Sequence, residues 1–405
     1  MGFLNGVWNI LSPNKVIRNF FLRSIDGYSI TDNIDTSTTQ GQYLSYIANP
    51  FISTIIDEKT NAFVNGKVFV EKNGVEFTSP DVKMILDLLN KPNGYQSNVE
   101  FLKNIYRNCQ IFGGAYILPI DLGLSSVKGF SCLLNSCLDI EFDFKSYPFS
   151  ITKTNFIKRI TYTNPYDGHY YDLTEYKDKL IIVKLNEDET KIGQPQSKLV
   201  QLNDQINTLN VACDATLNLL RNHGALMMIT NRSKDMSGMI PMKPSEKDEF
   251  YEDYYKKFGI QGGKNKILFS NHDLNAVKIS LPIADLQLGE NEKRAVRTIS
   301  KALGYDMLLL GFPDGSTFNN MNEAKLSLYE NTIIPESITL WSGMDVLLKD
   351  GNFKAYYDHL EIFQESEKTK AERDRLYIDN GKQLVDNGIY TIEQYKEYLT
   401  EKEVI

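Results

Sequence analysis

The stretch from Leu288 to Asp350 constrains the fold of this 405-residue chain more than any other part of it. Its residues predict a charged helix, then a short loop rich in glycine and asparagine, then a second long helix that Pro335 interrupts. The stretch holds no group of side chains suited to covalent chemistry. We therefore interpret it as a loop that is held at a fixed place between two helical supports.

The first third of the chain predicts helices and a hairpin. Helical spacing relates five positions that we expect to pack in the core, namely Ile52, Ile55, Ile56, Lys59 and Phe63. Asn65–Gly66 ends this helix, and an Asn73–Gly74 turn between valine-rich runs predicts a β-hairpin. Ser97 and Glu100 then have the spacing of a capping box at the start of another helix.

The middle of the chain adds strands and one clear helix. Residues 160–164, 169–176 and 179–185 have alternating faces and predict an antiparallel meander. From residue 197 the sequence predicts a helix that Gly224 ends, and residues 225–230 follow as an extended segment. The helix has a continuous apolar stripe, which consists of Leu199, Leu202, Ile206, Leu209, Cys213, Leu217 and Leu220. Together these patterns predict an α+β fold.

The charge balance limits how the chain can meet nucleic acid. It has 44 Lys and Arg against 52 Asp and Glu, a formal net charge of −8. Tight wrapping of DNA requires many cationic side chains that face phosphates, so this balance argues against it. An acidic surface still allows DNA to pass without sticking. The sequence has no run of about 18 apolar residues, and we expect no membrane span.

A search for catalytic or cofactor-binding motifs finds little. GIQGGKN at 259–265 resembles a phosphate-binding loop, but Phe258 replaces its first glycine and Asn265 replaces its hydroxyl residue. Carboxylate pairs such as Glu290 and Glu292 lie in highly charged helical stretches, where both stay solvated. The four cysteines and four histidines lack the spacing of a metal site. We therefore expect no enzyme, no cofactor and no metal, and interpret the chain as a structural or assembly protein.

Several passages resemble the portal proteins of tailed bacteriophages, of the type related to HK97. The first lies in 88–117 and resembles the family pattern LNxPN…F…G.AY at Leu89, Asn90, Pro92, Asn93, Phe101, Gly114, Ala115 and Tyr116. The second lies in 299–340 and resembles the family's stem helix, loop and long helix at Ile299, Ala302, Gly304, Leu309, Gly311, Ser316, Thr317, Asn320, Glu323, Ala324, Tyr329, Thr332 and Pro335. In place of the family's VPP after the stem helix, this chain has Tyr305, Asp306 and Met307.

The resemblance implies a homo-oligomeric ring, dodecameric in capsids, at one capsid vertex. Double-stranded DNA would pass through its central channel without sequence specificity, both in packaging and in ejection. A terminase packaging motor would dock on one end, which head–tail connector or adaptor proteins later occupy, and capsid and scaffold proteins would be further partners. The protein would be found in the virion, and in the host cytoplasm during assembly, with no membrane partner.

The resemblance also divides the chain into parts of a portal subunit. It implies a mixed α/β wing (1–244), stem helices (245–258 and 288–305), a small α/β clip (259–287), a tunnel loop (306–321), a kinked wing helix (322–352) and a helical crown (353–405). The expected channel residues of the tunnel loop are Gly311, Asp314, Gly315, Ser316, Thr317, Phe318, Asn319 and Asn320. The expected stem residues are Glu290, Glu292, Lys293, Arg294, Arg297 and Lys301. The clip is expected to dock the motor and connector at Gly262, Gly263, Lys264, Asn265 and Lys266, and Pro335 is expected to kink the wing helix.

Two other functions stay open at this point. One is another head or tail component, such as an adaptor or scaffold protein, which would lack a helix–loop–helix that projects into a central hole. The other is a phage-encoded nuclease or hydrolase, which requires a metal or nucleophile cluster. Loss of metal-dependent cleavage on replacing Asp285 or Glu323 would favour that second function.

Overall fold

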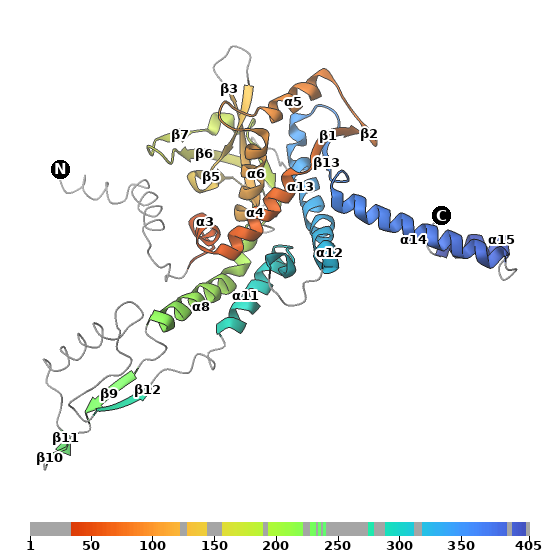
Figure 1. The fold of residues 1–405 in the computed structure, drawn as a ribbon. Helices are drawn as coiled ribbons and strands as arrows, with labels where there is room; N and C mark the ends of the chain where they lie inside the picture. The colour runs from red at the N-terminus through yellow and green to blue at the C-terminus, as the bar shows by residue number, and fades with distance from the viewer. Residues whose placement is uncertain are drawn as a thin grey trace. The chain divides into compact units, whose positions relative to one another are not determined.

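The computed structural model describes residues 34–121, 128–143, 156–188, 193–221, 227–231, 234–235, 238–239, 274–278, 288–311, 318–386 and 391–401. The chain divides into two compact units. Unit 1 comprises Met1–Ser53, Pro165–Gly168 and Leu199–Ala302, and unit 2 comprises Thr54–Asn164, His169–Lys198 and Leu303–Ile405. Figure 1 shows the helices and strands of both units.

Unit 1 contains a pair of packed helices, α8 (Asn203–Arg221) and α11 (Leu288–Ala302) (Figure 1). A 3₁₀ turn, Lys198–Leu202, leads into α8. The buried side chains here are mainly apolar: Leu199, Leu202, Ile206, Leu209 and Ala212 on the α8 side, and Ala295, Val296 and Ile299 on α11. We call this contact the α8–α11 seam. Full burial of one leucine or isoleucine contributes about 1.5–3 kcal/mol, so the seam stabilises unit 1.

The apolar stripe predicted for α8 is confirmed in its first half only. Its first four members are buried, whereas Cys213 is exposed. An α-helix has about 3.6 residues per turn, so a stripe that repeats every 3.5 residues drifts around the helix and leaves the packed face. The side chains of Leu217 and Leu220 lie outside the described part of the chain.

The polar side of α8 binds the backbone of Ile34 and Thr36, which lie more than 160 residues earlier in the sequence. The Asn207 side chain accepts the Ile34 N–H at 2.9 Å and donates to the Ile34 carbonyl at 3.0 Å. Asn203 accepts the Thr36 N–H at 3.2 Å. Helix α3 (Thr39–Ala48) follows, capped by a Thr38 side chain that accepts a backbone N–H. Asparagine amides thus fix this backbone to α8 at two successive turns.

Short strands complete the described part of unit 1. Strand β9 (Met227–Asn231) pairs antiparallel with β12 (Leu274–Lys278), and β10 (Lys234–Asp235) pairs with β11 (Gly238–Met239). The sequence division had placed β9 in the wing, residues 1–244, and β12 in the clip, residues 259–287. The ladder therefore joins the end of the first segment to the second, and the division itself stays a prediction.

Unit 2 is centred on helices α4 (Pro50–Val64), α6 (Asn98–Phe112) and α13 (Ile334–Met344). The core prediction for α4 is confirmed, since all five members of its stripe are at most 2% exposed. The Phe63 ring stacks on Tyr106, with centroids 4.4 Å apart, and on Trp341 at 6.3 Å. The predicted capping box also forms, and it starts α6 because Ser97 and Glu100 satisfy each other's backbone N–H.

The remaining elements of unit 2 form three antiparallel sheets. Their orders are β13-β1-β2, β4-β3-β8 and β5-β6-β7. The strands are β1 (Lys67–Lys72), β2 (Val75–Glu76), β3 (Gly114–Asp121), β4 (Lys128–Leu133), β5 (Leu138–Phe142), β6 (Ile157–Thr163), β7 (Tyr170–Asp172), β8 (Ile181–Lys184) and β13 (Asn352–Tyr356). Helix α5 (Pro80–Asn90) and the 3₁₀ turns Asn135–Cys137 and Thr174–Tyr176 connect them.

The predicted hairpin forms as β1–β2, but the predicted meander is wrong in its last strand. Strand β8 pairs with β3 and not with β7. Both β3 and β8 are largely buried, with Ile117 and Ile181 at most 2% exposed. Burial therefore favours the pairing of β8 with β3 over a pairing with β7, the strand before it in sequence.

Helices dominate the C-terminal part of unit 2. Helix α12 (Phe318–Leu328), a π-helical turn (Tyr329–Ile333) and α13 run on without a break. A 3₁₀ turn (Asp345–Leu347) leads to β13, and the helices α14 (Glu361–Asp386) and α15 (Ile392–Glu401) pack on each other. No helix in the part of the chain that the structure describes combines the length and apolar character of a bilayer-spanning segment.

Candidate functional site

The predicted stem residues lie on α11 around its buried face. Glu290, Arg294, Arg297 and Lys301 are exposed, whereas Glu292 and Lys293 are half-buried. The three exposed cations are spaced i, i+3, i+7, which places them on one side of the helix. The helix ends at Ala302 and not at the predicted 305.

The predicted loop of residues 306–321 begins with helical structure. A 3₁₀ turn, Met307–Leu310, starts at Asp306, whose side chain accepts the Leu308 N–H at 2.9 Å. Gly311 is exposed and closes this turn with a left-handed φ of +77°. Of the predicted loop residues, Asp314, Gly315, Ser316 and Thr317 lie outside the described part of the chain.

The other three predicted loop residues lie in a helix. Phe318, Asn319 and Asn320 form the first turn of α12, which begins before the predicted position 322. Asparagine and phenylalanine have only modest helix propensity, which favoured a loop in the sequence. In the structure, buried Ala324 and Leu328 hold α12 against the rest of unit 2, and packing outweighs propensity.

The predicted clip falls mostly outside the described residues. Only β12 is described between 259 and 287, and the predicted helix 245–258 is not described. The five expected docking residues, Gly262, Gly263, Lys264, Asn265 and Lys266, also lie outside. Their roles stay predictions.

Pro335 follows the π-helical turn directly. In that turn the Ile334 N–H donates to the Tyr329 carbonyl, five residues earlier. Proline has no N–H, and in a regular α-helix its ring crowds the carbonyl four residues before it. The wider π-helical turn relieves this crowding. The helix is therefore irregular just before this proline, because the turn Tyr329–Ile333 contains one extra residue.

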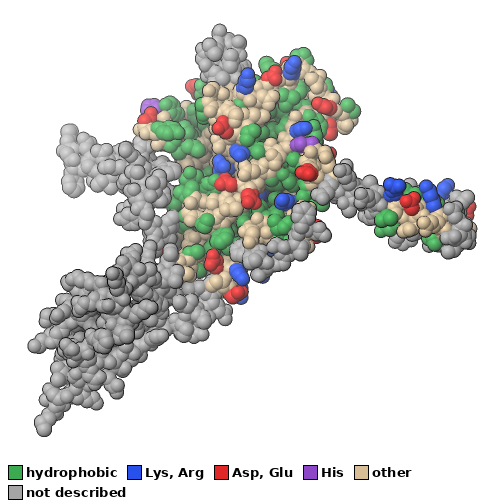
Figure 2. Space-filling model, in the orientation of Figure 1, with side chains coloured by type: hydrophobic (Ala, Val, Ile, Leu, Met, Phe, Trp, Pro, Cys, Tyr) green, Lys and Arg blue, Asp and Glu red, His purple; other side chains and the backbone are tan. Residues whose placement is uncertain are grey.

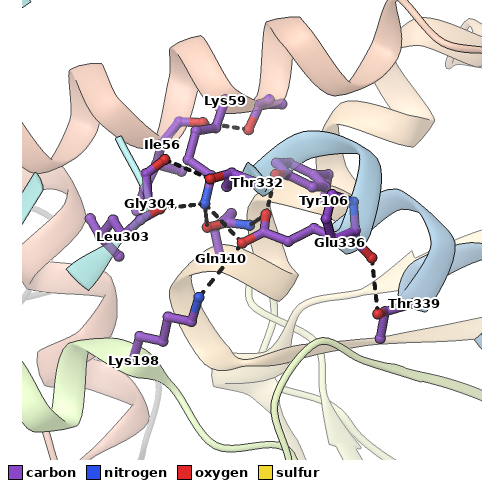
Figure 3. A network of polar contacts seen from close by, with 12 residues as sticks. Ile56, Lys59, Tyr106, Gln110, Lys198, Leu303, Gly304, Thr332, Glu336 and Thr339 are labelled. Carbon is purple, nitrogen blue, oxygen red and sulfur yellow. Dashed lines mark hydrogen bonds and ion pairs between the residues drawn. The ribbon is translucent and has the colours of Figure 1, made fainter. Parts of the chain in front are cut away.

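A buried charged cluster lies where α4, α6 and α13 meet (Figure 3). The Lys59 side chain is completely buried. Its ammonium group donates to Gln110 Oε1 at 2.8 Å, to the Leu303 carbonyl at 2.7 Å and to Glu336 Oε1 at 3.0 Å. Three donors therefore meet three acceptors, which is the full hydrogen-bonding capacity of a lysine.

Glu336 is the counter-charge of this cluster. Gln110 Nε2 donates to Glu336 Oε2 at 2.6 Å, and the Tyr106 hydroxyl donates to the same oxygen. Lys198 Nζ lies 3.6 Å from the other carboxylate oxygen. We call these five residues, Lys59, Tyr106, Gln110, Lys198 and Glu336, the Lys59 cluster.

Burial controls the titration of the cluster. It lowers the pKa of Lys59 to about 8, although the Glu336 charge and hydrogen bond act in the opposite direction. Burial, and then the Glu336 charge, raise the pKa of Tyr106 well above its usual range, so its hydroxyl stays a neutral donor. At neutral pH Lys59 is thus a cation paired with a carboxylate.

Next to the cluster, the residues before and after the predicted loop are bonded together. The Thr332 hydroxyl donates to the Gly304 carbonyl at 2.8 Å, and the Tyr305 hydroxyl donates to the Glu58 carboxylate on α4. Gly304 has a left-handed φ of +69°, and a Cβ atom there would lie 2.6 Å from Thr332 Oγ1. Only glycine fits this close approach without strain.

The sequence placed Lys59 in the core but assigned it no role. A lysine inside a stripe of isoleucines is itself a signal, because a fully buried lysine requires partners. Its partners are 51, 244 and 277 residues away in sequence, so spacing could not identify them.

The described residues show little that could do covalent chemistry. Among them, no three His, Cys, Asp or Glu side chains are grouped so as to hold a metal ion. Burial raises the pKa of the Cys132 thiol to about 12 and that of Cys109 well above its usual range. Both groups are therefore protonated and poor nucleophiles at neutral pH.

Two uncharacterized Rickettsia proteins are similar to the chain in sequence. The one from Rickettsia bellii is 23% identical over 261 residues, which cover 62% of this chain and 61% of the relative. The one from Rickettsia felis is 23% identical over 273 residues, which cover 63% and 64%. The chain thus spans less than two thirds of the length of these relatives.

Solved structures share the fold. A chain in the neck of an empty gene transfer agent particle has a TM-score of 0.56 at 17% identity, covering 92% of this chain and 95% of that chain. An HK97 family phage portal protein from Corynebacterium diphtheriae has a TM-score of 0.52 at 11% identity, covering 80% and 96%. The model of the family described as phage portal protein matches residues 67–399. The α+β fold is therefore of the portal type, and this chain belongs to the phage portal protein family.

Proposed function

We propose that this chain is the subunit of a ring at one capsid vertex and that double-stranded DNA enters and leaves the capsid through the ring. The observation that carries the proposal is the family match over residues 67–399, which includes α11, α12 and α13. A chain of similar fold in the neck of a native gene transfer agent particle with C12 symmetry, with a TM-score of 0.55, supports twelve copies. The proposed role is structural and not catalytic.

Exposed apolar side chains of unit 2 support self-assembly. Val75, Met84, Tyr95 and Val99 are between 48% and 76% exposed. A ring requires an interface between two different faces of each subunit, and such side chains gain stability when a neighbour covers them. Hydrophobic side chains are also common on the face that Figure 2 shows.

The distribution of charge supports weak contact with DNA. Lys and Arg are interspersed with Asp and Glu on the described surface in Figure 2, and the chain as a whole carries −8. On α11 the cations Arg294, Arg297 and Lys301 share one side with the acidic Glu290 in the first turn. Mixed signs allow brief contact with phosphates without tight binding, as a sliding DNA requires.

We assign the parts of the subunit by the same family argument. Helix α11 would be a stem helix, residues 306–321 the tunnel loop, residues 259–287 the clip that docks the terminase motor and connector, and residues 353–405 the crown. Residues 1–244 would form most of the wing, and their strand β9 pairs with β12 of the clip. Capsid and scaffold proteins are further proposed partners, and the proposed location is the virion, with the host cytoplasm during assembly.

Imaging of the purified protein tests the ring. Negative-stain electron microscopy should show a closed ring with a central hole, and native mass spectrometry should give its copy number. Single chains alone, both in purified protein and in extracts that contain assembling capsids, would contradict the proposal.

Bulky residues at the loop test the channel. Replacement of Asn319 and Asn320 by tryptophan should leave ring assembly intact and reduce the DNA packaged per particle. Normal DNA packaging by rings of this variant would rule out the assignment of 306–321 to the channel.

A further inference from the structure

The Lys59 cluster joins two points of the chain that flank the proposed tunnel loop. Leu303 precedes the loop and Glu336 follows it, and the Lys59 ammonium group bonds both, at 2.7 and 3.0 Å. Figure 3 shows the three residues converging from separate elements. One buried side chain of α4 therefore fixes both ends of the loop-bearing segment.

This bond requires a hydrogen-bond donor, because the Leu303 carbonyl follows the last turn of α11. The final carbonyls of a helix lack intrahelical donors, and a cation is the favoured partner there. An isoleucine or methionine would fill the same space in the stripe of α4, but could not bond this carbonyl. The desolvation of Lys59 is offset only because all three of its donors are used.

A second pair of bonds acts on the same points. Thr332 bonds the Gly304 carbonyl at 2.8 Å, so the two ends of the segment also bond each other directly. Tyr305 bonds Glu58, the neighbour of Lys59 on α4. The ends at 303–305 and 332–336 are thus held both to α4 and to each other.

We propose that Lys59 and Glu336 are positioning residues that clamp both ends of the loop-bearing segment onto α4 and so set how far the proposed tunnel loop reaches toward DNA. This inference rests on the proposed portal function. Since interfaces and packed cores switch between discrete arrangements instead of deforming continuously, loss of the clamp should release the segment as a whole.

The test compares the full-length wild type with Lys59→Met. Methionine fills the stripe without the three hydrogen bonds. We expect rings to assemble, and amide hydrogen exchange to accelerate about tenfold or more in peptides that contain 303–305 and 332–336. Exchange in the β5-β6-β7 sheet should stay unchanged, and particles with the variant should retain several-fold less DNA after packaging. The exposed substitution Lys349→Met is the matched control and should change none of these quantities.

Unchanged exchange at both ends of the segment would overturn the clamp. Acceleration spread equally over the β5-β6-β7 sheet would also overturn it, because Lys59 would then only stabilise unit 2. If Lys59→Met does not fold, Glu336→Gln decides, since it is nearly isosteric but removes the negative charge that pairs with Lys59 and accepts from Tyr106 and Gln110. Faster exchange at 303–305 in that variant supports the clamp, and unchanged exchange overturns it. A wild type that forms no ring would refute the channel role, while the exchange comparison on single chains would still decide whether the clamp exists.

Discussion

The α8–α11 seam is apolar, whereas the junction of α4, α6 and α13 encloses the Lys59 cluster. In the seam, Val296 and Ile299 are completely buried, and their contacts have no required direction. Several apolar sets of the same volume would pack there. In the junction each hydrogen bond has a fixed geometry, and few arrangements satisfy all of them. Packing in the seam thus depends on side-chain volume, whereas packing in the junction depends on the direction of hydrogen bonds. Directional bonds suit the two ends of a segment that must be held in one place.

Glu336→Ala should have the largest effect on the junction. It leaves the Lys59 charge buried without its counter-ion and removes the acceptor of Tyr106 and Gln110. We expect the free energy of unfolding to fall by about 3–5 kcal/mol. Urea denaturation followed by circular dichroism measures it, with the exposed Glu330→Ala in the preceding turn as control. Equal small losses in both variants would mean that the junction depends on volume after all.

Ile299→Ala should have the next largest effect, on the seam. It leaves a cavity at a completely buried site, and we expect a loss of about 2–4 kcal/mol by the same denaturation measurement. Ile299→Leu keeps the volume and should cost less than about 1.5 kcal/mol. The exposed Thr298→Ala is the control. A loss from Ile299→Leu as large as that from Ile299→Ala would show that the seam, too, requires one geometry.

The pH dependence of the free energy of unfolding should reveal the contribution of Lys59. Its folded pKa of about 8 lies below its ordinary value of 10.5, so the unfolded chain binds more protons between these values, and stability rises with pH across this window. Between pH 7.5 and 9 the wild type should gain about 1 kcal/mol relative to Lys59→Met. Glu336, Lys198 and Tyr106 face Lys59, and the two proteins differ in sequence at Lys59 alone. Parallel pH profiles of the two proteins would contradict the expected shift.

Lys349→Met should have the smallest effect. Lys349 Nζ lies 2.7 Å from Asp81 Oδ2, but both side chains are more than half exposed. Water and salt screen such a pair, so we expect no measurable change in the denaturation midpoint. A clear loss would show that ion pairs stabilise this chain regardless of burial, and the contrast between the cluster and the surface would disappear.

Periodic patterns predicted much of the fold. The stripe on α4, the capping box of α6 and the β1–β2 hairpin follow from residue spacing and turn chemistry, which act over a few residues. The family was also predictable, because passages that resemble portal proteins, such as 88–117, occur in the order of a portal subunit, and the family match confirms it.

Features that depend on distant partners were not predictable. The pairing of β8 with β3 and the exposure of Cys213 are decided by tertiary packing. The Lys59 cluster joins residues up to 277 positions apart, and the sequence signals only that one lysine lies in an apolar stripe. The start of α12 at Phe318 was missed because its first residues are weak helix formers.

The π-helical turn at Tyr329–Ile333 has a consequence for the phase of the helix that contains it. Each residue of an α-helix rotates the side chains by about 100°, so the one extra residue turns α12 by about that angle relative to α13. Deleting a residue there would restore the regular period and swing Ala324 and Leu328 out of their packing. Insertions and deletions tolerated in this helix during evolution should therefore come as whole turns, and rarely as single residues.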